Sequence, residues 1–150
     1  MLVPIKRGGA TGYESWSPEL RERIVQVLKG YDAFEGKTVR PEGLIPDHKF
    51  PEIRWDDSTS RGRLEALTNL QISSDFQLLN NQRNLQKREV CRACYQSGRR
   101  GFPLGIKYFY KGNEDWPKDI PARGKAAEEG CVGCGWYDFE KWRIALSRKS

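Results

Sequence analysis

The stretch that decides the fold is residues 75–94, DFQLLNNQRNLQKREVCRAC. Its start, Asp75 to Leu79, is a short apolar run that predicts a β-strand. Residues 81–90 contain neither Gly nor Pro and predict a helix directly after that strand. Because the upstream run LIPDH, residues 44–48, predicts another strand, the sequence indicates two strands followed by a helix within an α+β fold.

An amphipathic helix is predicted before these strands. Ser17 is a favourable N-cap, Pro18 suits the first helical position, and Gly30 can end the helix. Apolar residues repeat at helical spacing between them: Leu20, Ile24, Val27 and Leu28. We therefore treat residues 1–43 as an N-terminal arm and helix, and residues 44–150 as the core.

The rest of the chain predicts one more strand and further helical turns. Residues 106–110, IKYFY, have the aromatic content typical of strands. Residues 63–70 are expected to add one or two helical turns between the first two strands, and residues 115–130 form a surface loop rich in Pro, Gly and charge. A closing helix follows, with apolar residues along one face: Phe139, Trp142 and Leu146.

Charge and composition favour some partners over others. The chain has 26 basic and 20 acidic residues and a net charge of +6, which favours an anionic partner such as nucleic acid. No apolar run approaches the roughly 18 to 20 residues of a membrane span, and residues 1–12 lack the apolar region of a signal peptide. We expect no membrane partner and a reducing, cytoplasmic location.

A hydrophobic share of 37% is low, and a thin core often needs a metal or a partner subunit.

All the cysteines of the chain fall in two CxxC pairs, Cys91 with Cys94 and Cys131 with Cys134. In a reducing compartment, such pairs indicate metal ligands rather than disulfides. Thiolates from two such pairs make the closed tetrahedral set of structural Zn²⁺, which leaves no open position for a reacting water. The alternatives are a redox pair, buried free thiols, or iron–sulfur ligation.

A candidate catalytic group is centred on His48, the only histidine of the chain. A lone histidine is more often structural, but Asp47 precedes this one, and Asn84 lies in the predicted helix. Imidazole, with an unperturbed pKa near ~6.5, is a suitable base for activating water. A hard cation such as Mg²⁺ prefers oxygen ligands, here the carboxylate of Asp47 and the amide oxygen of Asn84. Asn80 and Asn81 compete with Asn84 for that place.

The chain resembles the HNH nuclease family, and more narrowly the HNH subgroup of type II restriction endonucleases. The segments that carry the resemblance, within residues 44–146, are DHKFPEIRW, DFQLLNNQRNLQKREVCRAC, KYFYKGNEDW and GCVGCGWYDFEKWR. It implies a ββα-metal fold in which His48 is the general base and Asp47 and Asn84 hold one Mg²⁺ or other divalent ion. Asp75 occupies the place of the family's middle Asn, which orients the histidine.

Two features depart from the family pattern. Asp75 stands where the family has Asn, and residues 32–36, DAFEG, lack the CxxC knuckle that many members carry before the histidine. Neighbours on a strand point to opposite faces, so Asp47 and His48 need a twist or a strand end to serve one site.

The resemblance implies a site-specific double-stranded DNA endonuclease of a restriction system that acts as a homodimer, because palindromic sites suit two-fold symmetric proteins. Two alternatives stay open: a less specific HNH nuclease or nickase of a phage or mobile element, and a non-catalytic zinc-ribbon module that binds DNA. Basic side chains suit phosphate or base contacts, although many merely form solvated faces. The predicted DNA contacts are Arg83, Lys87, Arg88 and Arg54.

Overall fold

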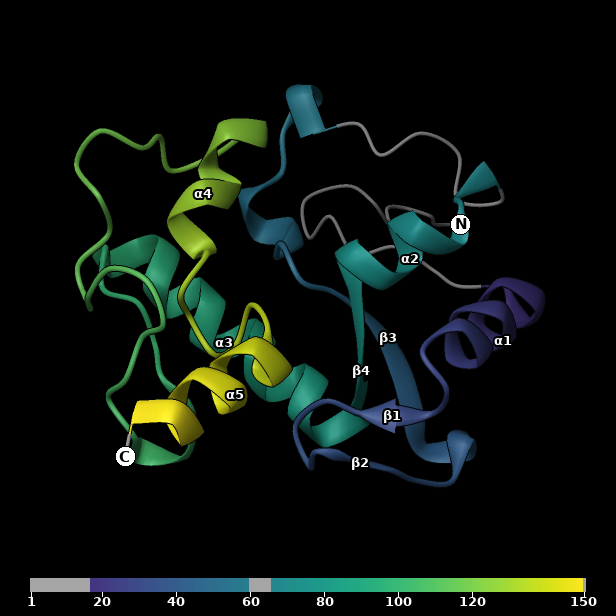
Figure 1. The fold of residues 1–150 in the computed structure, drawn as a ribbon. Helices are drawn as coiled ribbons and strands as arrows, with labels where there is room; N and C mark the ends of the chain where they lie inside the picture. The colour runs from purple at the N-terminus through teal and green to yellow at the C-terminus, as the bar shows by residue number, and fades with distance from the viewer. Residues whose placement is uncertain (1–16, 60–65, 150) are drawn as a thin grey trace.

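The computed structural model describes residues 17–59 and 66–149, which form a small mixed sheet surrounded by helices (Figure 1). The sheet has four strands in the order β2-β1-β4-β3. Its strands are β1 (Tyr31–Asp32), β2 (Lys37–Thr38), β3 (Leu44–His48) and β4 (Phe76–Asn80). The α+β class expected from the sequence is confirmed, whereas the predicted arm at residues 1–16 lies outside the described residues.

The described residues also form α-helices. They are α1 (Pro18–Val27), α2 (Asn69–Asp75), α3 (Asn81–Ser97), α4 (Glu128–Cys131) and α5 (Phe139–Lys149). Short 3-10 turns lie at η1 (Pro41–Gly43), η2 (Glu52–Arg54), η3 (Asp57–Thr59), η5 (Pro103–Gly105) and η6 (Lys125–Ala127). No described helix combines the length and the apolar character needed to cross a bilayer.

Local signals in the sequence explain where these helices begin. The hydroxyl of Ser17 accepts a hydrogen bond from the backbone amide of Leu20 at 3.1 Å, and Pro18 opens α1, as predicted. The turns expected within residues 63–70 fall partly outside the described residues, and the described part contains the start of α2. There, Thr68 and Gln71 form a capping box.

The long helix α3 follows β4 without a connecting loop. Asn80 ends β4 and caps α3, since its side-chain oxygen accepts a hydrogen bond from the amide of Arg83 at 2.8 Å. The helix continues to Gly98, which has a left-handed φ of 76° that glycine adopts readily. It is therefore longer than the segment predicted at residues 81–90, and both Cys91 and Cys94 lie within it.

The strands β3 and β4 form an antiparallel pair whose register places the site residues. Asp47 lies opposite Gln77, and His48 lies opposite Phe76. Because successive strand residues face opposite sides, Asp47 and Gln77 share one face and His48 and Phe76 share the other. β4 also pairs in parallel with β1, so the described part of the N-terminal segment belongs to the same sheet as the rest.

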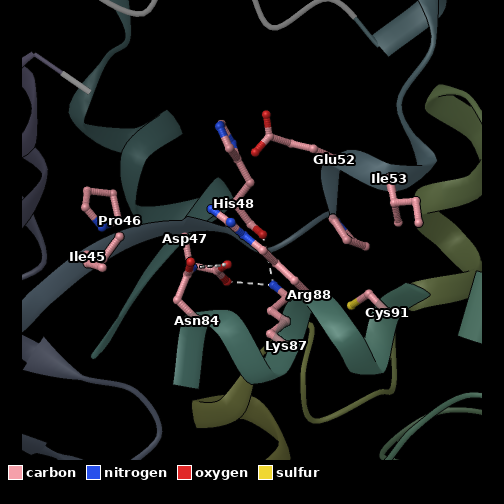
Figure 2. Close-up of a pocket in the computed structure, with 11 residues that line it drawn as sticks. Ile45, Pro46, Asp47, His48, Glu52, Ile53, Asn84, Lys87, Arg88 and Cys91 are labelled. Carbon is pink, nitrogen blue, oxygen red and sulfur yellow. Dashed lines mark hydrogen bonds and ion pairs between the residues drawn. The ribbon is translucent and has the colours of Figure 1, made fainter. Parts of the chain in front are cut away.

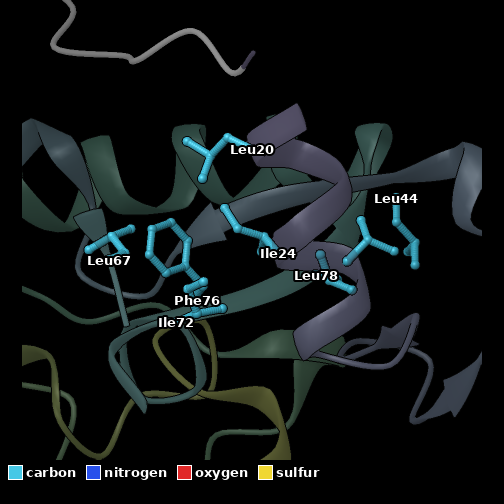
Figure 3. Close-up of a cluster of buried hydrophobic side chains, with 8 residues drawn as sticks. Leu20, Ile24, Leu44, Leu67, Ile72, Phe76 and Leu78 are labelled. Carbon is cyan, nitrogen blue, oxygen red and sulfur yellow. The ribbon is translucent and has the colours of Figure 1, made fainter. Parts of the chain in front are cut away.

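An apolar cluster under the sheet fixes this register (Figure 3). Its members come from α1, α2, the two long strands and the residue before the N-cap of α2: Leu20, Ile24, Val25, Leu44, Leu67, Ile72, Phe76 and Leu78. Burying each large apolar side chain contributes about 1.5 to 3 kcal/mol. A slip of one residue would turn Phe76 and Leu78 away from this core, so the cluster specifies which residues of β4 face α3.

The strand predicted at residues 106–110 is wrong, because the structure has no strand there. The backbone of this segment bonds to other groups instead: the amide of Tyr110 donates to the carbonyl of Gly133, and that of Tyr108 donates to the carbonyl of Ile106. The aromatic side chains favour a strand locally, but no neighbouring strand supplies a ladder of hydrogen bonds.

Candidate functional site

A small pocket lies between the end of β3 and the face of α3 that carries Asn84 and Lys87 (Figure 2). Its volume is about 50 Å³. Polar and charged side chains from three separate segments line it: Asp47, His48, Glu52, Asn84, Lys87 and Arg88. The predicted base and the two predicted oxygen ligands therefore border one cavity, although they are far apart in the sequence.

The buried carboxylate of Asp47 is the centre of the polar network. Its Oδ2 accepts hydrogen bonds from Nζ of Lys87 at 2.6 Å and from Nε2 of Gln77 at 3.0 Å. Its Oδ1 accepts one from Nδ2 of Asn84 at 3.3 Å. The structure thus brings Asp47 and Asn84 together, and it adds Gln77, which sequence reasoning missed although it lies on the predicted strand.

The three candidate asparagines have different places. The side chain of Asn80 caps α3, and Asn81 is exposed. Asn84 is buried one turn further along the helix and faces Asp47. Of the three, Asn84 is the one that lines the pocket.

Lys87 is buried and points inward rather than toward solvent. Besides Asp47, its ammonium group donates to the backbone carbonyls of His48 at 2.9 Å and Lys49 at 3.0 Å. Burial lowers the pKa of Lys87 and is the largest single effect, but the charge and the hydrogen bond of Asp47, together with the nearby cysteines, outweigh it and the pKa is raised. The expected DNA contact by Lys87 does not fit this place, because helical periodicity puts Lys87 on the same buried face as Asn84.

His48 is the last residue of β3, and its ring lies between two aromatic side chains. The ring centroids are 4.7 Å from Trp55 and 4.6 Å from Phe76. Figure 2 shows the imidazole pointing away from the Asp47 carboxylate and toward the side of the pocket occupied by Glu52. The strand end lets both residues border one pocket, and Glu52 is a further polar neighbour that the sequence did not single out.

Asp75 ends α2 and does not begin β4, contrary to the predicted strand boundary. Its backbone carbonyl accepts a hydrogen bond from the amide of Lys49 at 2.9 Å, and its carboxylate accepts one from the hydroxyl of Ser74 at 3.3 Å. Asp75 is not among the side chains that line the pocket. The register places it one position beyond the pair formed by His48 and Phe76.

The other three predicted basic contacts are half-buried or buried. Arg83 is half-buried, with its guanidinium 4.2 Å from the ring of Phe34, and Arg88 is half-buried at the pocket. Arg54 is only 2% exposed, donates to the carbonyl of Ala122 at 2.8 Å and stacks 3.8 Å from the ring of Trp116. A guanidinium with these partners does not face DNA, so the predicted contact by Arg54 is not retained.

The four cysteines line a second, smaller cavity of about 20 Å³ behind the pocket. All four are free thiols, and burial raises the pKa of Cys91 to about 12. As placed, Sγ of Cys94 accepts a hydrogen bond from Arg54 at 3.2 Å, and Sγ of Cys134 donates to the carbonyl of Gly101 at 3.3 Å. Within residues 17–59 and 66–149, no group of Cys, His, Asp or Glu is arranged to hold a metal ion without rearrangement.

The turn between Cys131 and Cys134 requires glycine. Gly133 has a φ of 110°, and a Cβ added there would lie 2.0 Å from the carbonyl oxygen of Lys111. The same close approach lets the carbonyl of Gly133 accept the amide of Tyr110. The second CxxC pair is therefore held against the segment that the sequence had predicted as a strand.

Chemically, the pocket offers two carboxylates, an amide, an imidazole, a buried ammonium and a half-buried guanidinium, and the second cavity offers four thiols. The first set can bind a hard cation and an anion, whereas the second suits a soft cation. In comparisons with known proteins, no family model, no curated protein and no solved structure matches the chain.

Proposed function

We propose that this protein is a divalent-metal-dependent DNA endonuclease that hydrolyses phosphodiester bonds at a ββα-metal (HNH-type) site formed by β3, β4 and α3. The observation that carries the proposal is the meeting of Asp47 and Asn84, from separate segments, in a pocket that His48 also lines. The antiparallel pair β3–β4 running directly into α3 supports the same conclusion.

The donor set fits one Mg²⁺ ion. Lys87 and Gln77 occupy Oδ2 of Asp47, so Oδ1 is the oxygen that faces Asn84. The oxygen and nitrogen of an amide are assigned from hydrogen bonds, and a half-turn of the Asn84 amide presents its oxygen to the same point. Mg²⁺ typically takes one or two protein oxygens and keeps several waters. A bound Mg²⁺ would neutralise charge on the phosphate and on the leaving oxygen.

The other pocket residues have roles in positioning and proton transfer. His48 accepts the proton of the attacking water through its imidazole, on the side of the pocket away from Asp47. Arg88 lines the pocket at the face of α3, where a guanidinium can contact a phosphate. Lys87 and Gln77 hold the Asp47 carboxylate in one orientation.

We propose that the four cysteines hold a structural Zn²⁺. The support is that both CxxC pairs line one cavity and that none of the thiols is in a disulfide. Ligation requires Cys134 to give up the proton that it donates to the carbonyl of Gly101 and to turn into the cavity, whereas Cys94 can keep the hydrogen bond that it accepts from Arg54. Such a site would connect α3, which carries Asn84, to the end of α4 and the turn before α5.

Within this activity, we propose a site-specific restriction endonuclease that acts as a homodimer on double-stranded DNA. The net charge of +6 and the sequence resemblance to HNH restriction enzymes support this choice. A second candidate, a non-catalytic module that binds DNA, is favoured by one observation: His48 is only 6% exposed and lies between Trp55 and Phe76, as a structural histidine would.

A plasmid digest tests the proposal. We expect the wild-type chain to cut supercoiled plasmid with Mg²⁺ or Mn²⁺ and not with EDTA. His48→Ala should lower the rate by a hundredfold or more, on the order of the effect of general acid–base groups. Asn84→Ala should also lower the rate, because it removes a proposed ligand of the metal. Gln82→Ala, an exposed position on the same helix, is the matched control and should cut normally.

The products decide between the candidates. Fragments of discrete size, with ends that sequencing places at one motif, support the restriction enzyme; nicked or smeared plasmid supports the less specific nuclease. Retarded DNA without cleavage under any divalent cation favours the binding module. Wild-type cleavage by His48→Ala would rule out the assignment of the base.

A further inference from the structure

Three deeply buried cations line the cavity that the four cysteines share: Arg54, Lys87 and Arg100, which are 2%, 3% and 3% exposed. Lys49, which is less buried, also lines it. No aspartate or glutamate is among the described residues that border the cavity. A buried positive charge is costly unless an opposite charge lies nearby.

Among the described residues, the two lysines have carboxylate partners and the two arginines do not. Lys87 pairs with Asp47 at 2.6 Å, and Lys49 pairs with Asp138 at 3.0 Å. In the part of the chain that the structure describes, neither Arg54 nor Arg100 forms an ion pair with an acidic side chain. The positive charges of the two guanidinium groups therefore need a negative charge from another source.

The arginines do have hydrogen-bond partners, but these are neutral. Arg100 donates to the backbone carbonyls of Lys111 at 2.6 Å, Asn113 at 2.8 Å, Val132 at 2.9 Å and Gly130 at 3.2 Å. It thereby joins the loop after residue 110 to the second CxxC pair. Arg54 donates to the carbonyl of Ala122 and to Sγ of Cys94 at 3.2 Å. Carbonyl dipoles satisfy the N–H groups and leave the net charge in place.

We propose that Arg54 and Arg100 are the counter-charges of a four-thiolate metal centre formed by Cys91, Cys94, Cys131 and Cys134. A divalent ion with four thiolates has two surplus negative charges, and the two guanidinium groups carry two positive charges. Four neutral thiols would leave both arginines without a counter-charge. This inference rests on the proposed zinc site and assigns positioning residues that stabilise it.

The geometry gives the two arginines separate tasks. Arg54 makes a charge-assisted hydrogen bond to the sulfur of Cys94, from the first CxxC pair. Arg100 binds the carbonyls on both sides of Cys131, those of Gly130 and Val132, and so fixes the backbone of the second pair. Partners of this kind, behind the ligands, typically change metal affinity 10- to 100-fold.

Zinc competition with a chromophoric chelator tests the inference on the full chain. We expect one Zn²⁺ per wild-type chain, and an affinity lowered about 10- to 100-fold by Arg54→Gln and by Arg100→Gln. Arg54→Lys keeps the charge and should lose less. Arg99→Gln is the matched control, since Arg99 is exposed beside Arg100, and it should bind zinc as the wild type does.

Repeating the measurement in a variant with one cysteine ligand replaced separates an effect of charge from an effect on folding. Cys91→His replaces a thiolate by a neutral imidazole and removes one negative charge from the centre, so Arg54→Gln should cost less zinc affinity there than in the four-cysteine protein. Equal losses in both backgrounds would overturn the inference. The inference would also be overturned if Arg54→Gln bound zinc as tightly as the wild type while its Tm fell by the same amount with and without zinc.

Failure of the zinc site itself is a distinct outcome. A wild-type chain that binds no Zn²⁺ overturns this inference together with the proposed metal centre, whatever the plasmid digest shows. Conversely, a smaller loss of zinc affinity for Arg54→Gln in the Cys91→His protein would support this inference even if the protein cuts no DNA.

Discussion

At the scale of single residues, the site depends on how one buried carboxylate is satisfied. Three side chains converge on Asp47, and one of them is the ammonium of Lys87, which also bonds the carbonyls of His48 and Lys49. The same lysine therefore neutralises the proposed ligand and ties the end of β3 to α3. A positive charge that seemed suited to DNA instead holds the site together.

Removing this charge should destabilise the fold. Lys87→Met keeps the length of the side chain but leaves Asp47 buried without its cation, and loss of one partner of a buried pair costs roughly 3 to 5 kcal/mol. Both side chains are almost fully buried, so solvent screens the pair little. Urea unfolding measures the change, with the exposed Gln86→Met as control. A loss below about 1 kcal/mol would contradict the role assigned to the pair.

At the scale of elements, α3 organises the protein. It begins at the end of β4, carries Asn84, Lys87, Cys91 and Cys94 at intervals of three or four residues, and ends at Gly98. Residues at this spacing lie on one face, so the helix presents the pocket and the cysteine cavity on the same side. The position of its first turn therefore sets the place of Asn84 relative to Asp47.

Loss of the cap of α3 should cost stability without removing a ligand. In Asn80→Ala the amide of Arg83 loses its side-chain acceptor, which typically costs about 1 kcal/mol. Asn81→Ala, next along the chain and exposed, should change stability little. Thermal unfolding in the presence of zinc gives the comparison. If Asn81→Ala proved the more costly of the two, the cap assignment would be wrong.

At the scale of the whole molecule, the described residues pack around several separate apolar clusters rather than one large core. One lies under the sheet, and the others lie near the cysteines and include Trp136, Phe139 and Phe50. The segment from residue 98 to residue 138 contains little regular structure, so side-chain and backbone contacts around the cysteine cavity must hold it.

Of the two proposed metals, only Zn²⁺ should therefore contribute markedly to the stability of the fold. Chelation of Zn²⁺ by a strong chelator should lower the Tm markedly and expose the thiols to alkylation, since a structural ion contributes to folding. Omission of Mg²⁺ should abolish cleavage and leave the Tm within a few degrees. A Tm that does not respond to zinc removal would argue against a structural metal.

The sequence by itself determined the elements whose signals are local. Ser17 and Pro18 mark the start of α1, and the apolar runs LIPDH and DFQLL mark β3 and β4, with β4 shifted by one residue. Helices α3 and α5 follow from the absence of helix breakers and from apolar spacing. Caps, runs and periodicity act within a few residues, so they can be read without knowing what lies beside them.

Only the tertiary structure decided which side chains are buried and which contact each other. Residues 106–110 have the composition of a strand but no strand to pair with, and Arg54 has the charge of a DNA contact but stacks on Trp116. The alternation along β3 sends His48 and Asp47 to opposite faces, and packing of Phe76 and Leu78 fixes that choice. Burial and pairing depend on residues distant in the chain, and local sequence carries no record of them.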